Sequence, residues 1–155
     1  MYLQQFERLQ TLAISCDQAW DFFSNPMNLP LITPPDLGFR VIPPVPERMY
    51  QGMLVQYTVT PIGKIPVSWV TEITHVREGS FFVDEQRFGP YRFWHHQHFF
   101  EEVSGGTRMR DVVSYGLPFA PCSSILLPWV KKRLAYIFDY RYQTLLNRFG
   151  DVTSY

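Results

Sequence analysis

The chain has 155 residues, of which 46% are hydrophobic and 17% aromatic, so we expect one domain over 1–155 with a sizeable core. Fourteen basic residues balance fourteen acidic ones, which argues against nucleic acid as a partner. The two cysteines are in no metal-ligand or redox spacing. No apolar run reaches the roughly 18 residues of a membrane span, and the N-terminus lacks the layout of a signal peptide, so we expect a cytoplasmic protein.

The first third of the chain predicts a strand, two short helices and an edge strand. Residues 2–14 alternate between polar and apolar side chains, as a half-buried strand does. Ser15 is predicted to cap the first helix, with Gln18 as its capping-box partner. A second short helix is predicted over 26–31. The sequence that follows is rich in proline, so only 38–42 is predicted as a strand, at a sheet edge.

The middle of the chain predicts further strands joined by short turns. The predicted strands are 53–60, 65–76 and 81–87, followed by a hairpin within 88–115. Turns are expected at Pro61-Ile62-Gly63 and at Gly89-Pro90. Consecutive strands with short turns favour an antiparallel sheet.

The hairpin from Phe88 to Tyr115 is the most informative part of the sequence. If Ser104-Gly105 is its two-residue loop, the pairing register of both strands follows. That register places Glu102 opposite Thr107, Phe100 opposite Met109, His98 opposite Asp111, His96 opposite Val113, and Trp94 opposite Tyr115. Side chains two apart share a face, so one face combines apolar residues with two histidines and a carboxylate. This combination is typical of a pocket that holds a mainly apolar molecule through a few polar groups.

One long helix is predicted at the C-terminus. Pro128 fits its first turn and Gly150 its end, which gives about 22 residues or roughly 33 Å. Its apolar stripe consists of Val130, Leu134, Ile137, Phe138, Leu145 and Phe149. Arg141 lies near this stripe, and we expect it to extend to solvent; a salt bridge to an anionic ligand group is the alternative.

Several short motifs carry a resemblance to a known superfamily. They are Thr33-Pro34-Pro35, Asp84-Glu85-Gln86, Gly89-Pro90-Tyr91, Trp94-x-His96-x-His98-x-Phe100, Gly105-Gly106-Thr107-x-Met109-x-Asp111 and Tyr115-x-Leu117-Pro118. With the order of predicted elements, they resemble the START-like superfamily (SRPBCC type), which includes birch-pollen-allergen proteins and polyketide cyclases. The resemblance implies an α+β helix-grip fold: a curved antiparallel sheet of about seven strands around one long C-terminal helix, with two short helices after the first strand. It also implies a cavity for lipids, hormones, polyketides or other apolar molecules, with cyclisation or dehydration in some members, and no cofactor.

His98 and Asp111 are the candidate catalytic residues. A carboxylate opposite an imidazole orients the ring and raises its pKa, which suits a general acid or base. A buried pair that only fixes the strand register is the alternative. Asp84 and Gln86 supply further polar groups if their face of the strand points inward. His96, His98 and Asp111 also form a set that a metal accepts, but the aromatic surroundings favour an organic ligand, so no metal is expected.

The predicted ligand-binding residues extend along the whole inner face. They are Tyr57, Trp69, Thr71, Asp84, Gln86, Trp94, His96, His98, Phe100, Met109, Asp111 and Tyr115. Ordinary core packing is the alternative for the aromatic members. The apolar loops 29–46 and 117–129 are predicted to gate the cavity; packing onto the sheet, or contact with a membrane surface or a second subunit, are the alternatives.

Three functions follow from this reasoning. The first is binding of a hydrophobic or aromatic small molecule, lipid- or polyketide-like, between sheet and helix. The second is a cyclase or dehydratase in which His98 transfers the proton, Asp111 orients it, and Tyr115 or His96 assists. No G-x-S-x-G motif is present, which disfavours covalent catalysis. The third is a protein-interaction module that uses the apolar loops, for example as a homodimer.

Overall fold

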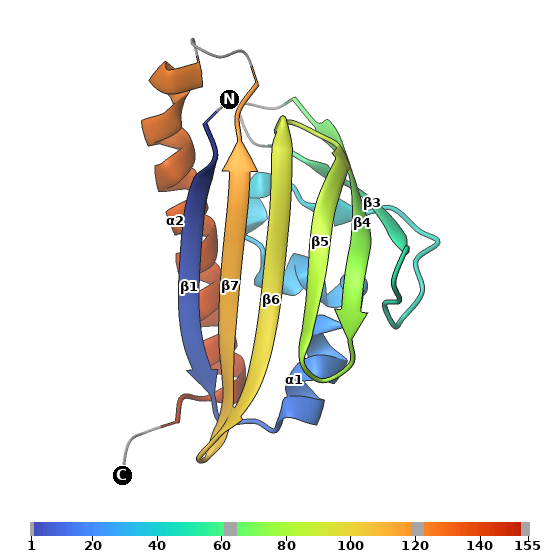
Figure 1. Cartoon of the computed structure of the whole chain (residues 1–155), viewed down its shortest axis with the longest axis vertical. Coiled ribbons are helices and arrows are strands. Elements are labelled where there is room, and N and C mark those ends of the chain that lie inside the picture. Colours follow the sequence, from blue (N-terminus) through green and yellow to red (C-terminus); the bar gives the residue numbers. More distant parts are fainter. Residues whose placement is uncertain (1, 61–64, 119–122, 153–155) are drawn as a thin grey trace.

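The computed structural model describes residues 2–60, 65–118 and 123–152. Its elements are β1 (Gln4–Leu12), α1 (Cys16–Phe23), the 3₁₀ helices η1 (Pro26–Ile32) and η2 (Pro35–Leu37), β2 (Arg40–Val41), β3 (Leu54–Val59), β4 (Val67–Arg77), β5 (Phe81–Phe88), β6 (Phe93–Val103), β7 (Gly106–Gly116) and α2 (Ser123–Phe149). All strand pairs are antiparallel, in the order β1-β7-β6-β5-β4-β3-β2. Figure 1 shows α2 running along one face of this curved sheet, with α1 behind the same face. The predicted helix-grip fold is confirmed.

The start of α1 has the predicted capping box. The Ser15 hydroxyl accepts a hydrogen bond from the Gln18 backbone N–H at 3.2 Å, and the Gln18 side chain accepts one from the Ser15 N–H at 3.0 Å. Two N–H groups that the first helical turn leaves free are thereby satisfied. The second short helix also forms, but as a 3₁₀ helix over Pro26–Ile32. The edge strand shrinks to Arg40–Val41, in keeping with the prolines around it.

The predicted register of the β6–β7 hairpin is confirmed at every pair. His98 lies opposite Asp111, and the hairpin closes with Val103 opposite Gly106. Gly105 in the loop has φ of +82°, a conformation that side chains other than glycine rarely adopt. The residues predicted to share the inner face are all buried except Trp94, which is half-buried. The turn predicted at 61–63 lies outside the described residues.

The helix α2 begins earlier than predicted. It starts at Ser123 and has 27 residues, so the start at Pro128 was wrong and this proline lies in the second turn. The loss of one intrahelical hydrogen bond at Pro128 is offset by packing, because Leu127 contacts the buried cluster around Val113 and Tyr115. The helix ends as predicted, where the Gly150 N–H donates to the Leu146 carbonyl at 2.8 Å.

The second apolar loop is therefore largely helical. Residues 125–129 belong to α2, and their side chains include exposed Ile125, Leu126 and Trp129 (81%, 56% and 42% exposed). Residues 119–122, which were also assigned to this loop, lie outside the described part of the chain. Among the helices of the described residues, none combines the length and apolar character needed to cross a membrane.

Candidate binding cavity

A cavity of about 180 Å³ lies between the sheet, α2 and the short helices. Most of its lining is apolar, from Phe22, Phe23, Leu29, Ile32, Leu37, Phe39, Met49, Val55, Val59, Trp69, Ile73, Phe82, Trp94, Leu134, Ile137 and Phe138. Its polar lining residues are Asn25, Asn28, Thr33, Tyr57, Thr71, Asp84, His96, His98 and Arg141. The mixture is that of small-molecule sites, in which a few polar groups orient a mainly apolar ligand.

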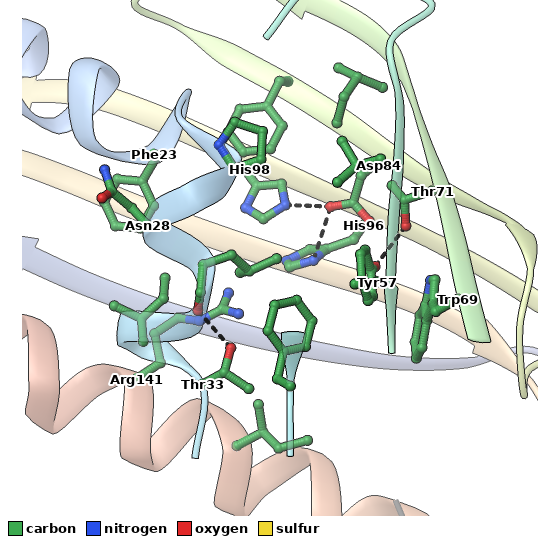
Figure 2. A pocket seen from close by; sticks show the side chains of 18 of the residues that line it. Phe23, Asn28, Thr33, Tyr57, Trp69, Thr71, Asp84, His96, His98 and Arg141 are labelled. Carbon is green, nitrogen blue, oxygen red and sulfur yellow. Dashed lines mark hydrogen bonds and ion pairs between the residues drawn. The ribbon is translucent and has the colours of Figure 1, made fainter. Parts of the chain in front are cut away.

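The charged wall of the cavity is assembled by three neighbouring strands. In the register, Asp84 on β5 lies opposite His96 on β6, and His98 on β6 lies opposite Asp111 on β7. The two imidazoles are two residues apart on one strand, so their rings lie side by side with centroids 3.7 Å apart. Figure 2 shows both rings directed at the Asp84 carboxylate.

His98 is held between two carboxylates. Its Nε2 lies 2.7 Å from Asp84 Oδ2 and its Nδ1 lies 3.0 Å from Asp111 Oδ1. Ionised carboxylates only accept hydrogen bonds, so Nε2 donates to Asp84, and the second carboxylate beside Nδ1 favours the imidazolium form of His98. Burial by itself lowers the pKa of His98, but the hydrogen bonds to Asp111 and Asp84 outweigh burial and raise it.

His96 is in a different state from its neighbour. Its Nε2 donates to Asp111 Oδ1 at 2.8 Å, whereas its Nδ1 is 3.4 Å from Asp84 Oδ2 and makes no hydrogen bond there. Burial and the charge of His98 lower the pKa of His96. The lowered pKa favours the neutral imidazole, and the hydrogen bond to Asp111 places its proton on Nε2.

Both carboxylates stay ionised. Burial would raise the pKa of Asp111, but the hydrogen bonds from His96 and His98 hold it well below its ordinary range. The same imidazoles lower the pKa of Asp84, whose Oδ1 also accepts from Trp94 Nε1 at 3.3 Å. The buried Asp111 and the half-buried Asp84 therefore face the His98 cation and the guanidinium of Arg141, and the cluster is electrically neutral.

Arg141 does not extend to solvent, so that prediction was wrong. It is 9% exposed, and its guanidinium lies 4.8 Å from the centre of the Phe138 ring. Figure 2 shows it reaching from α2 toward the imidazoles. Its Nη1 is 3.9 Å from Asp111 Oδ1, too far for a hydrogen bond. The Arg141 side chain therefore ends at the cavity wall and not on the solvent side of α2.

The remaining predicted residues separate into lining and supporting groups. Tyr57, Trp69, Thr71 and Trp94 line the cavity, and the Tyr57 hydroxyl lies 2.7 Å from Thr71 Oγ1. Gln86 points to the turn instead, where its amide bonds the backbone N–H and carbonyl of Tyr91.

Besides Gln86, four predicted residues do not line the cavity. Phe100 and Met109 are in one buried cluster and Tyr115 is in another, so core packing accounts for them. Asp111 lies behind the two imidazoles and reaches the cavity only through them.

The wall formed by α1, η1 and η2 was not predicted in detail. Phe22 and Phe23 come from α1, and Leu29, Ile32 and Leu37 come from the two 3₁₀ helices. The sequence shows that these residues are apolar, but it does not show which buried surface they contact. Leu29, Ile32 and Leu37 belong to the loop 29–46 that was predicted as a gate, and in the structure they form part of the cavity wall.

One atom from each of Asp84, His96 and His98 lies within 4.8 Å of the others, the spacing of a metal-binding set. The carboxylate of this set is Asp84, whereas the alternative metal set considered from the sequence contained Asp111, which faces the opposite nitrogens of the two rings. Asp111 would then orient both imidazoles from behind.

No protein-family profile matches the chain, and no curated protein sequence matches it significantly. Solved structures do share its architecture. The Zhui aromatase/cyclase from a Streptomyces species is 12% identical, with a TM-score of 0.75 over 95% of this chain and 93% of its own. A Thalictrum norcoclaurine synthase mutant, solved with a transition-state analogue, is 15% identical, with a TM-score of 0.66 over 95% and 96%. Ara h 8.0201 is 13% identical, with a TM-score of 0.63 over 94% and 99%.

At these identities the likeness concerns the fold. The seven-stranded antiparallel sheet, the short helices after β1 and the long C-terminal helix are the elements that the matches share. The chain therefore has the helix-grip fold of these structures, which is the fold that its resemblance to the START-like superfamily implied.

Proposed function

We propose that this protein binds a small, mainly apolar, ring-containing molecule in the cavity between the sheet and α2. The observation that carries the proposal is the cavity of about 180 Å³, whose walls are aromatic and aliphatic except for the charged cluster on one side. An apolar cavity of about 150 Å³ is enough to bind benzene. In this conformation the space therefore suits a single ring better than a long lipid or a polyketide.

Filling the cavity tests this proposal. Val55 lines the cavity from β3, whereas the neighbouring Leu54 points to the opposite face and is 60% exposed. We expect p-cresol to bind the unaltered protein and the Leu54→Phe variant, but not Val55→Phe, as measured by ligand-observed NMR. Native mass spectrometry of freshly purified protein would identify any molecule that is retained. Equal binding by Val55→Phe and Leu54→Phe would place the ligand elsewhere and refute the proposal.

A second candidate function, proton transfer, is favoured by the contrast between the two histidines. His96 is neutral with a free Nδ1 lone pair, and His98 is a cation beside it. Adjacent groups whose pKa values are moved apart are a frequent basis for acid–base chemistry. For a ketone in the cavity, His96 Nδ1 would take a proton from the carbon next to the carbonyl, and the charge of His98 would stabilise the enolate. The aromatase/cyclase among the structural matches supports this candidate.

This candidate can be tested before the natural substrate is known. Acetophenone carries a single ring and exchangeable protons next to its carbonyl, so its exchange in D₂O can be followed by NMR. We expect the protein to accelerate this exchange, His98→Gln to abolish the acceleration while acetophenone still binds, and His75→Gln, an exposed histidine on β4, to leave it unchanged. Binding without accelerated exchange would leave the protein as a carrier.

A further inference from the structure

We infer that Arg141 is an acid-recognition group, and that the ligand is a single-ring aromatic molecule bearing a carboxylate. The inference rests on the proposed binding function and specifies its ligand. The inference is based on the charged groups that line the cavity. Among the described residues, Asp84 and His98 are paired with each other, whereas Arg141 has N–H donors without a partner.

The other charged groups of the wall are already engaged. Asp84 accepts from His98 at 2.7 Å and from Trp94 at 3.3 Å. Both nitrogens of His98 face carboxylates at hydrogen-bond distance. These groups therefore offer few free donors to a ligand.

Arg141, in contrast, has donors that are not engaged by the residues that the structure describes. Within the described part of the chain its Nε is buried without a hydrogen-bond partner, and Asp111, its nearest carboxylate, is 3.9 Å away. A buried guanidinium has five N–H donors, and leaving them unsatisfied is costly. Its planar arrangement of donors matches a carboxylate, which it binds through two parallel hydrogen bonds.

The surroundings of Arg141 define the rest of the ligand. Its guanidinium packs over the Phe138 ring, and both residues line the cavity. Nearby, Thr33 gives its hydroxyl hydrogen to the Leu29 carbonyl at 2.7 Å, which leaves Arg141 as the donor on this side. The cavity beyond is lined by aromatic rings, including Phe22, Phe23 and Phe82. A volume of about 180 Å³ accommodates one ring with one short acidic group.

An anion at Arg141 is also compatible with the local charges. Asp111 lies behind the imidazoles and does not line the cavity, and Asp84 is neutralised by the His98 imidazolium. The carboxylate of the ligand would therefore meet the guanidinium rather than either aspartate. The ligand adds one negative charge to a cluster that is neutral without it, so its attraction to the guanidinium at close range has to outweigh its repulsion by the two aspartates.

The test compares two probes of nearly equal shape, benzoate and benzamide, by calorimetry. The unaltered protein should bind benzoate about 10- to 100-fold more tightly than benzamide, as expected for the loss of a charge-assisted hydrogen-bond pair. Arg141→Met should remove this preference while p-cresol still binds. Arg141→Lys, which keeps the charge but loses the planar donors, should retain part of it.

A matched control is available on the same helix. Arg148 also lies over an aromatic ring, at 5.2 Å from the centre of Phe22, but it is exposed, so Arg148→Met should leave both affinities unchanged. If the unaltered protein binds benzamide as tightly as benzoate, or if Arg141→Met keeps the preference for benzoate, the inference is wrong while the cavity proposal stands. If no single-ring compound binds at all, the proposed function itself is refuted, and the inference with it.

Discussion

Replacing Asp111 by asparagine tests whether the charged cluster is a balanced unit. Asp111 accepts a hydrogen bond from His96 at 2.8 Å, and its Oδ1 lies 3.0 Å from His98 Nδ1 and 3.9 Å from the Arg141 guanidinium. Asparagine keeps the shape but removes the charge. The two buried cations, His98 and Arg141, would then face only Asp84.

The expected cost is large because the group is buried. At about 4 Å and an effective dielectric constant of about 20, two unit charges interact by about 4 kcal/mol. Removing one partner of a buried ion pair typically destabilises a protein by about 3–5 kcal/mol. We therefore expect the free energy of unfolding of Asp111→Asn to fall by that amount. With a urea dependence of about 2 kcal/mol per M, the midpoint of unfolding should fall by about 1.5–2.5 M.

The control is Glu101→Gln, which removes an exposed carboxylate from a pair with Arg108 whose side chains are 48% and 64% exposed. Exposed pairs contribute less than about 1 kcal/mol, so the midpoint should barely move. The penalty of Asp111→Asn should also be greater at about pH 6 than at about pH 8.5, because His98 can lose its proton at the higher pH. If the two variants shift the urea midpoint equally, the reasoning about the cluster is refuted.

Three further predictions concern the pH dependence, the hairpin and a helix cap. In urea unfolding, His98→Gln should destabilise the protein more at about pH 6 than at about pH 8.5. The raised pKa of His98 stabilises the fold below its unfolded pKa of about 6.5, and this contribution is lost as the pH rises through the folded pKa. Equal losses of stability at both pH values would contradict this prediction. Gly106→Ala should lower thermal stability more than Gly79→Ala. A Cβ at Gly106 would lie 2.0 Å from the Leu12 carbonyl oxygen, whereas one at Gly79 meets nothing within 4 Å and costs only the backbone strain of a φ of +70°; similar melting temperatures would show that β1 moves aside. Ser15→Ala should lower the free energy of unfolding by about 1 kcal/mol through loss of the capping hydrogen bond, and an unchanged urea midpoint would show that α1 does not depend on its cap.

The sequence by itself predicts the features that depend on local spacing. The capping box of Ser15 and Gln18 follows from two residues three apart. The register that brings His98 opposite Asp111 follows from a two-residue loop and the alternation of side chains along a strand. Such rules act within one element or between neighbours, so they need no knowledge of the rest of the molecule.

The tertiary structure decides whatever depends on elements that are distant in the sequence. Asp84 meets His96 and His98 because of the β5–β6 register, and β4 contains register shifts that no local rule anticipates. Helix α2 begins before Pro128, and Leu127 in its early part packs against the buried cluster that contains Val113 and Tyr115. The apolar stripe of α2 does not determine on which side of the helix Arg141 lies. The rotation of α2 against the sheet places Arg141 at the cavity rather than in solvent. Burial is a property of the assembled fold. It decides the charge states of the aspartates and histidines in the cluster, and it places the Arg141 guanidinium at the cavity wall.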